Sequence, residues 1–236
     1  MAEPLYRSII LTARGLFRTL GLRISVTGLE HLPRTGGAVL AINHTSFLDF
    51  ALAGYPPDLV DHRVVRFMAK EAIFRHPVAG PLMRGMRHIP VDRAQGQAAY
   101  AEALRALKRG ELLGVFPEAT MSRSFDIKAL KNGAARMAAV ADAPLIPMIV
   151  FGGQRVLSYG HRDLTRGRPI AITIGEPMRP LVTDDVDQVT AQLRERLRAL
   201  LAETVQRYPE DGTGQWWCPQ RFGGTAPALD SSTTAA

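Results

Sequence analysis

Short apolar runs alternate with amphipathic stretches along most of this chain. The apolar runs predict strands over residues 24–28, 38–42, 63–69, 87–91, 112–116, 145–150 and 170–174. Apolar residues at helical spacing predict helices over residues 47–55, 77–86, 96–109, 127–141 and 184–208. This alternation indicates an α/β fold, with a mostly parallel sheet flanked by helices on both faces.

The first segment, residues 1–23, has the pattern of a basic amphipathic helix. Leu5, Ile9 and Leu16 recur at helical spacing, and arginines fall between them. Such a helix can lie in a membrane interface, or it can pack its apolar face on the domain, and the two are compatible. We expect some membrane contact, and we expect the core to fold without this segment.

The last segment, residues 209–236, is rich in Gly, Pro, Ser and Thr, which predicts a flexible, poorly ordered tail. Trp216 and Trp217 are the exception, because they can dock on the domain or lie at a membrane interface. The predicted organisation is therefore an amphipathic segment, a domain over residues 24–208, and a tail.

Composition narrows the classes of partner. A chain of 236 residues is long enough for one large α/β domain, and its net charge of +7 favours a polyanion such as nucleic acid, an anionic membrane surface or a phosphorylated substrate. Cys218 is the single cysteine, which excludes an intramolecular disulfide and a cysteine zinc site. The sequence has no run of about 18 apolar residues, so no transmembrane helix is predicted. Arginines interrupt the apolar stretches near the N-terminus, so no signal peptide is predicted either.

The stretch from Asn43 to Asp49 joins a predicted strand to a predicted helix. This edge of an open α/β sheet is where ligands bind. If His44 lies in the turn and Asp49 in the helix, the carboxylate can hold the imidazole in one tautomer and stabilise its protonated form. The alternative is that Asn43 or Ser46 simply caps the helix.

Charged residues also follow three other predicted strands. Lys70, Arg93 and Glu118 each lie at a strand's carboxyl end. Because a parallel sheet brings these ends to one edge, we expect them near His44. Four strands then contribute to one basic and acidic site.

Several blocks of sequence together resemble the glycerophospholipid acyltransferase family, which includes the bacterial 1-acylglycerol-3-phosphate acyltransferases. The first, Asn-His-x4-Asp, stands at residues 43–49, and Phe-Pro-Glu-Ala-Thr at 116–120 is similar to the family's Phe-Pro-Glu-Gly-Thr. The other similar blocks cover residues 69–77, 85–93 and 144–147.

The resemblance implies transfer of a fatty acyl group from acyl-CoA or acyl-carrier protein to a hydroxyl of lysophosphatidic acid or a related lysoglycerophospholipid, in phospholipid biosynthesis. His44 would be the general base and Asp49 would orient it; neither a metal nor a cofactor is implied. The enzyme would be peripheral, on the cytoplasmic face of the cell membrane. The family's substrate-binding positions correspond to Lys70, Arg93, Glu118, Ala119 and Thr120.

The chain departs from the family pattern at two positions. Ala119 replaces the usual Gly, which makes a left-handed backbone there less expected. Met121 replaces the usual Arg, which removes one phosphate contact unless Arg123 supplies it. Both departures affect the expected identity of the acceptor more than the expected acyl-transfer chemistry.

The chemistry is consistent with this family. A thioester is an activated donor, so the enzyme needs mainly a base near neutral pH for the attacking hydroxyl, and histidine is suited to this. Other acceptors, such as glycerol phosphate or a glycolipid, and a non-catalytic lipid-binding role stay open. A nucleic-acid-binding protein is disfavoured, because no such motif appears. A serine hydrolase using Ser46 is disfavoured too, because no nucleophile elbow is present.

Overall fold

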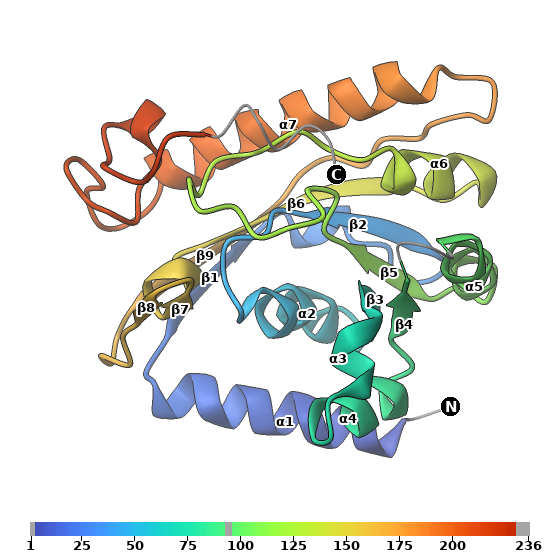
Figure 1. Ribbon diagram of the computed structural model, residues 1–236, viewed down its shortest axis with the longest axis horizontal. Coiled ribbons are helices and arrows are strands. Elements are labelled where there is room, and N and C mark those ends of the chain that lie inside the picture. The colour runs from blue at the N-terminus through green and yellow to red at the C-terminus, as the bar shows by residue number, and fades with distance from the viewer. Residues whose placement is uncertain (1–2, 93–95, 230–236) are drawn as a thin grey trace.

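A seven-stranded sheet runs through the middle of the protein, in the order β1-β9-β6-β2-β5-β3-β4 (Figure 1). The computed structural model describes residues 3–92 and 96–229. The strands of this sheet are β1 (Arg23–Thr27), β2 (Ala38–Ile42), β3 (Val65–Lys70), β4 (Ile89–Val91), β5 (Leu112–Val115), β6 (Leu145–Phe151) and β9 (Pro169–Ile174). Among the strand pairs of this seven-stranded sheet in the described residues, only β6–β9 is antiparallel, so the predicted mostly parallel sheet is confirmed.

Helices cover both faces of the sheet, as predicted. One face carries α5, α6 and α7, while α2 packs on the other and α1 lies beyond α2 (Figure 1). The helices are α1 (Pro4–Thr19), α2 (Asp49–Leu59), α3 (Glu71–Arg75), α4 (Ala79–Gly85), α5 (Gly96–Lys108), α6 (Gly133–Val140) and α7 (Val186–Gln206). Over the described ranges, no helix combines the length and the apolar character needed to cross a bilayer.

The central strands are buried on both faces. Every residue of β2 and of β6 is buried, which explains their uninterrupted apolar sequences. On α7, Val189, Leu193, Leu197 and Leu201 recur every fourth position and form the buried stripe. The resulting core holds the carboxyl end of β2, and hence the His44 loop, in a rigid frame.

Two connections differ from the prediction. The helix expected over residues 127–141 begins only at Gly133, because backbone groups before it bond to the loop after β5: Lys131 N–H donates to the Pro117 carbonyl at 2.8 Å. The polar connection after β6 contains a small hairpin, β7 (Leu157–Ser158) and β8 (His161–Arg162). Both differences place extra backbone beside the His44 loop.

The amphipathic helix α1 is packed on the domain. Phe17 and Tyr6 are buried, and the Tyr6 hydroxyl donates to the Val65 carbonyl at 2.7 Å. Glu3 forms an ion pair with Arg66, which is almost fully buried. The helix therefore contributes to the core, although its outer face carries exposed leucines, including Leu11.

Residues 209–229 also rest on the domain, although the sequence predicts a flexible tail there. Trp217 and Cys218 are buried, and the guanidinium of Arg155 lies 4.3 Å from the centre of the Trp217 ring. Arg155 also forms an ion pair with Glu210 at 2.6 Å. Residues 230–236, the rest of the predicted tail, lie outside the described residues.

Candidate active site at the carboxyl edge of the sheet

The loop after β2 brings His44 and Asp49 together. His44 lies before α2 and Asp49 begins it, so the two side chains meet although four residues lie between them. His44 Nδ1 lies 2.9 Å from Asp49 Oδ2. The geometry expected from the sequence is present.

Asp49 organises the whole loop. It is fully buried, and its Oδ2 accepts three hydrogen bonds, from His44 Nδ1–H and from the backbone N–H groups of Thr45 (2.7 Å) and Ser46 (2.8 Å). Burial raises the pKa of Asp49, while these donors oppose the rise by stabilising the carboxylate. The carboxylate thus fixes both the loop backbone and the imidazole.

The His44 ring lies between two aromatic side chains. It stacks on Phe116 with ring centres 4.3 Å apart and meets Phe50 edge-on at 6.1 Å. Its side chain is 16% exposed. Because Nδ1 donates to Asp49, the lone pair of Nε2 is left free, and no side chain or backbone group in residues 3–92 and 96–229 hydrogen-bonds to Nε2. This arrangement suits a general base.

Glu118 joins three segments of the site. It is buried, its Oε1 accepts the backbone N–H of His44, and its Oε2 accepts that of Lys128, both at 3.0 Å. Burial raises its pKa to about 7, against the effect of both hydrogen bonds. Both oxygens are therefore engaged by backbone. Arg93, which the sequence also predicts near His44, lies outside the described residues.

The raised pKa of Glu118 predicts a pH-dependent stability. Between pH 4.5, the ordinary pKa of glutamate, and about pH 7, the Glu118 carboxyl is protonated in the folded protein but ionised in the unfolded chain. The free energy of unfolding should therefore fall as the pH rises through this range, by about 1.4 kcal/mol per pH unit at most.

Urea unfolding of the wild type and of Glu118→Gln tests this prediction between about pH 4 and pH 8. Other carboxyl groups contribute to both proteins, so the difference between the two free energies carries the Glu118 effect. A difference that stays constant with pH would contradict the prediction.

Ala119 has a left-handed backbone, with φ of 62°. The expectation that alanine makes a left-handed backbone less probable at this position was wrong, because a tight turn imposes the conformation despite its cost. Ala119 N–H bonds to the Phe116 carbonyl at 3.0 Å, and Thr120 N–H bonds to the Glu118 carbonyl at 2.8 Å. The turn points the Glu118 carboxylate at the His44 loop at a conformational cost.

Ala119→Gly is therefore expected to stabilise the protein. Left-handed geometry costs a residue with a Cβ about 1–2 kcal/mol, and the greater flexibility of glycine in the unfolded chain offsets part of the gain. We expect a higher melting temperature by a few degrees. Ala141→Gly is the control: φ is −87° at this position, so glycine should not stabilise the protein there. An unchanged or lower melting temperature for Ala119→Gly would show that the turn carries no strain.

Lys128 is a site residue that the sequence did not suggest. Its Nζ donates to the carbonyl (2.7 Å) and the hydroxyl (2.6 Å) of Thr120, and burial lowers its pKa. Lys128 belongs to none of the matching blocks, so only the fold could reveal it. Thr120, a predicted substrate-binding residue, is thus already held by a cation.

Lys70 lies at the carboxyl end of β3 and is exposed. One strand, β5, lies between β3 and β2, so Lys70 shares the edge with His44 but does not follow a neighbouring strand. Met121 is buried, and Arg123 lies 5.1 Å from the centre of the Tyr159 ring. In the described ranges, no group of three His, Cys, Asp or Glu side chains could hold a metal ion.

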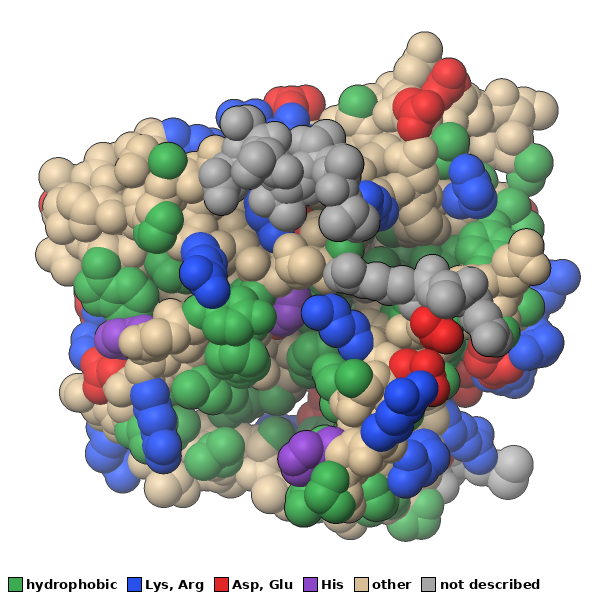
Figure 2. All heavy atoms as spheres, viewed as in Figure 1, with side chains coloured by type: hydrophobic (Ala, Val, Ile, Leu, Met, Phe, Trp, Pro, Cys, Tyr) green, Lys and Arg blue, Asp and Glu red, His purple; other side chains and the backbone are tan. Residues whose placement is uncertain are grey.

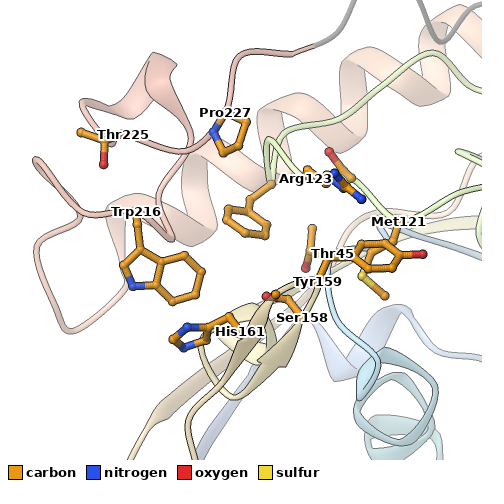
Figure 3. A pocket seen from close by; sticks show the side chains of 12 residues that line it. Thr45, Met121, Arg123, Ser158, Tyr159, His161, Trp216, Thr225 and Pro227 are labelled. Carbon is orange, nitrogen blue, oxygen red and sulfur yellow. The ribbon is translucent and has the colours of Figure 1, made fainter.

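Two hollows flank the His44 loop. A groove of about 140 Å³ between α1 and α2 is mainly apolar and includes Phe50, which touches the His44 ring. A cleft of about 610 Å³ lies on the other side of the loop and includes Thr45 (Figure 3). On the face drawn in Figure 2, hydrophobic side chains gather around a hollow, with Lys and Arg side chains between them. The base therefore stands between an apolar and a more polar space.

Known proteins share both sequence and fold with this chain. A family model described as Acyltransferase matches residues 23–151, more than half of the chain. The 1-acyl-sn-glycerol-3-phosphate acyltransferase of Bacillus subtilis is 29% identical over 201 residues, which cover 84% of this chain and 94% of that protein. The enzyme of the same name from Limnanthes douglasii is 31% identical over 177 residues, covering 72% and 59%.

The crystal structure of the 1-acyl-sn-glycerophosphate acyltransferase PlsC from Thermotoga maritima has a similar fold. The TM-score is 0.72 at 22% sequence identity, and the match covers 86% of this chain and 81% of that one. At this identity the likeness concerns the fold alone.

Proposed function

The chain belongs to the Acyltransferase family and is an acyltransferase, and we propose that it acylates the free hydroxyl of 1-acylglycerol 3-phosphate or a closely related lysophospholipid. The observation that carries this proposal is the buried Asp49 carboxylate holding His44 with Nε2 free. The names of the similar enzymes support the acceptor.

In the proposed reaction, His44 Nε2 takes the proton of the acceptor hydroxyl as its oxygen attacks the thioester carbonyl of the donor. A carbon–oxygen bond forms and the carbon–sulfur bond breaks, so that the thiolate leaves. The proton then passes from Nε2 to the thiolate, which departs as a thiol. Asp49 stabilises the transient imidazolium, as a buried carboxylate does in other acyl-transfer sites.

Cationic side chains at the same edge would bind the acceptor phosphate. Lys70 is exposed, and Arg93 follows β4 in sequence. Arginine offers a planar pair of donors to a phosphate, which favours Arg93 as the main contact. Thr120 and its bound Lys128 add a hydroxyl and a third cation near Glu118.

The apolar groove between α1 and α2 would receive part of a fatty chain. Aromatic rings line it on several sides, among them Phe17, Phe50 and Phe67. Phe50 also contacts the His44 ring, so a chain in the groove would end near the base. An apolar lining also excludes water, which would otherwise compete with the acceptor hydroxyl.

We further propose that the enzyme is peripheral and meets its lipid substrates at an anionic membrane surface. Leu5, Leu11 and Leu16 are exposed on α1, and Ile73 of α3, Leu82 of α4 and Val78, just before α4, are exposed as well. Basic side chains, such as Arg7, stand among them. Apolar and basic groups on one side suit an anionic interface.

The double variant Leu11→Ser, Leu16→Ser is expected to bind anionic vesicles at least about tenfold more weakly at unchanged melting temperature, because each exposed leucine loses its transfer into the interface. Wild-type binding should also weaken in high salt. Vesicle sedimentation measures both. Val182→Ser is the control, because this exposed residue precedes α7, the helix on the opposite face of the sheet from α1 (Figure 1). Equal vesicle binding by the wild type, the double variant and the control would exclude α1 as the docking surface.

Mass spectrometry of the products tests the function itself. The purified protein would be incubated with acyl-CoA or acyl-carrier protein and with lysophosphatidic acid, glycerol 3-phosphate or a glycolipid. Formation of phosphatidic acid is the expected result, and preference for another acceptor would correct the acceptor. Lipid binding without any product would identify a non-catalytic member of the family.

A further inference from the structure

The larger cleft beside the His44 loop is formed by three segments that are distant in sequence. They are residues 121–125, the β7–β8 hairpin, and residues 216–227 of the C-terminal segment (Figure 3). Ser122, which lines the cleft, donates its N–H to the His44 carbonyl at 2.7 Å. The cleft therefore begins within one residue of the proposed base, and its volume of about 610 Å³ suits a small-molecule ligand.

The walls of the cleft combine aromatic faces with a cation. Trp216 is 37% exposed and lies against His161, with ring centres 3.9 Å apart, while Tyr159 is 52% exposed (Figure 3). Arg123 lies over the Tyr159 ring, and no carboxylate pairs with it within residues 3–92 and 96–229. Exposed aromatic faces stack on nucleobases, and a free guanidinium binds phosphate.

Thr45 supplies an independent sign of a ligand. Its side chain lines the cleft and is 1% exposed, yet its hydroxyl has no hydrogen-bond partner among the described residues. A buried hydroxyl without a partner is costly, and such groups are rare in folded proteins. A ligand amide or carbonyl beside Thr45 would satisfy this hydroxyl next to His44.

We propose that this cleft binds the nucleotide-bearing part of a coenzyme A thioester. The adenine stacks on Trp216, a phosphate contacts Arg123, and the amide-containing arm passes Thr45, so that the thioester carbon arrives at His44. The inference rests on the proposed function, because it assigns a site to that reaction's acyl donor. A donor on a carrier protein lacks the adenosine and would leave the aromatic walls unused.

Donor kinetics test the proposal, with palmitoyl-CoA compared against palmitoyl-pantetheine, which lacks the nucleotide. Arg123→Ala and Trp216→Ala should each raise the KM for palmitoyl-CoA about tenfold, and leave the KM for palmitoyl-pantetheine unchanged. The matched control is Arg162→Ala, which removes the same charge from the hairpin at an exposed position that does not line the cleft.

Calorimetry with free CoA gives a second measurement that needs no turnover. CoA should bind the wild type and Arg162→Ala equally, and Arg123→Ala about tenfold more weakly. Equal binding by all three proteins, or equal KM changes for both donors, would overturn the proposed site. Transfer that works only from acyl-carrier protein would overturn it while leaving the acyltransferase function intact, whereas the absence of transfer from every donor would contradict the proposed function instead.

Discussion

Replacing His44 by alanine is expected to lower kcat for acyl transfer by about 10²- to 10⁴-fold, the contribution of a positioned general base. The loss follows from the geometry: Asp49 holds Nδ1 at 2.9 Å, and Nε2 is the free basic atom at the edge of the sheet. The Asp49 carboxylate keeps its two backbone donors, Thr45 and Ser46, in the variant. The loop should therefore survive, and the protein should fold.

The chain offers a matched control for this variant. His62 forms a second histidine–aspartate pair, with Asp58, but its side chain is 60% exposed and it follows α2 rather than preceding it. His62→Ala should keep full activity. Steady-state kinetics and thermal melts of both variants are the measurement; a folded His44→Ala enzyme with wild-type kcat would exclude His44 as the base.

The alternative mechanism, a serine hydrolase with Ser46 as the nucleophile, is disfavoured by the structure as well as by the sequence. Ser46 is fully buried; its hydroxyl donates to the Leu157 carbonyl at 2.7 Å and accepts the Leu48 N–H at 3.0 Å. Both capacities of the hydroxyl are thus engaged in the backbone of two segments. Ser46 acts as a structural connection between the His44 loop and the hairpin.

The strand, the turn and the pairing of His44 with Asp49 could be predicted because they are local. The strand predicted from the apolar run ends at Ile42, as β2 does in the structure. His44 and Asp49 lie within one strand–turn–helix unit. Glu118 was harder to interpret, since its partners are backbone groups of His44 and Lys128, and only the folded chain brings these together. A residue type predicts a chemistry, but backbone partners far along the chain decide whether the group is free to perform it.

The C-terminal segment shows the same limit. Its Gly- and Pro-rich composition predicts disorder, but Trp217 packs under Arg155, a residue of the connection after β6. Composition describes the average tendency of a segment, whereas one buried aromatic ring and one ion pair can fix its path. Such long-range contacts have no signature in local periodicity.

Helix α1 gives the second large expected effect: a protein truncated to begin at Arg23 should fail to fold cooperatively. The sequence suggests a removable membrane segment, but the structure makes α1 part of the core. Removal would uncover the sites of Phe17 and Tyr6, and loss of one buried aromatic side chain costs about 3–5 kcal/mol. It would also take Glu3 from the buried Arg66, which would disrupt a buried ion-pair network and add to the loss.

Together these losses reach the whole stability of a typical domain, about 5–15 kcal/mol. Thermal unfolding followed by circular dichroism measures the effect, with two point variants to separate its causes. Glu3→Gln should lower the melting temperature, because Glu111, at 3.1 Å, is then the one anionic partner left to Arg66 among the residues that the structure describes. Leu11→Ser should leave it unchanged, since that side chain is 67% exposed. A truncated protein that melts cooperatively near the wild-type temperature would show that the core folds without α1. Membrane contact through its exposed leucines would then be the role of this helix.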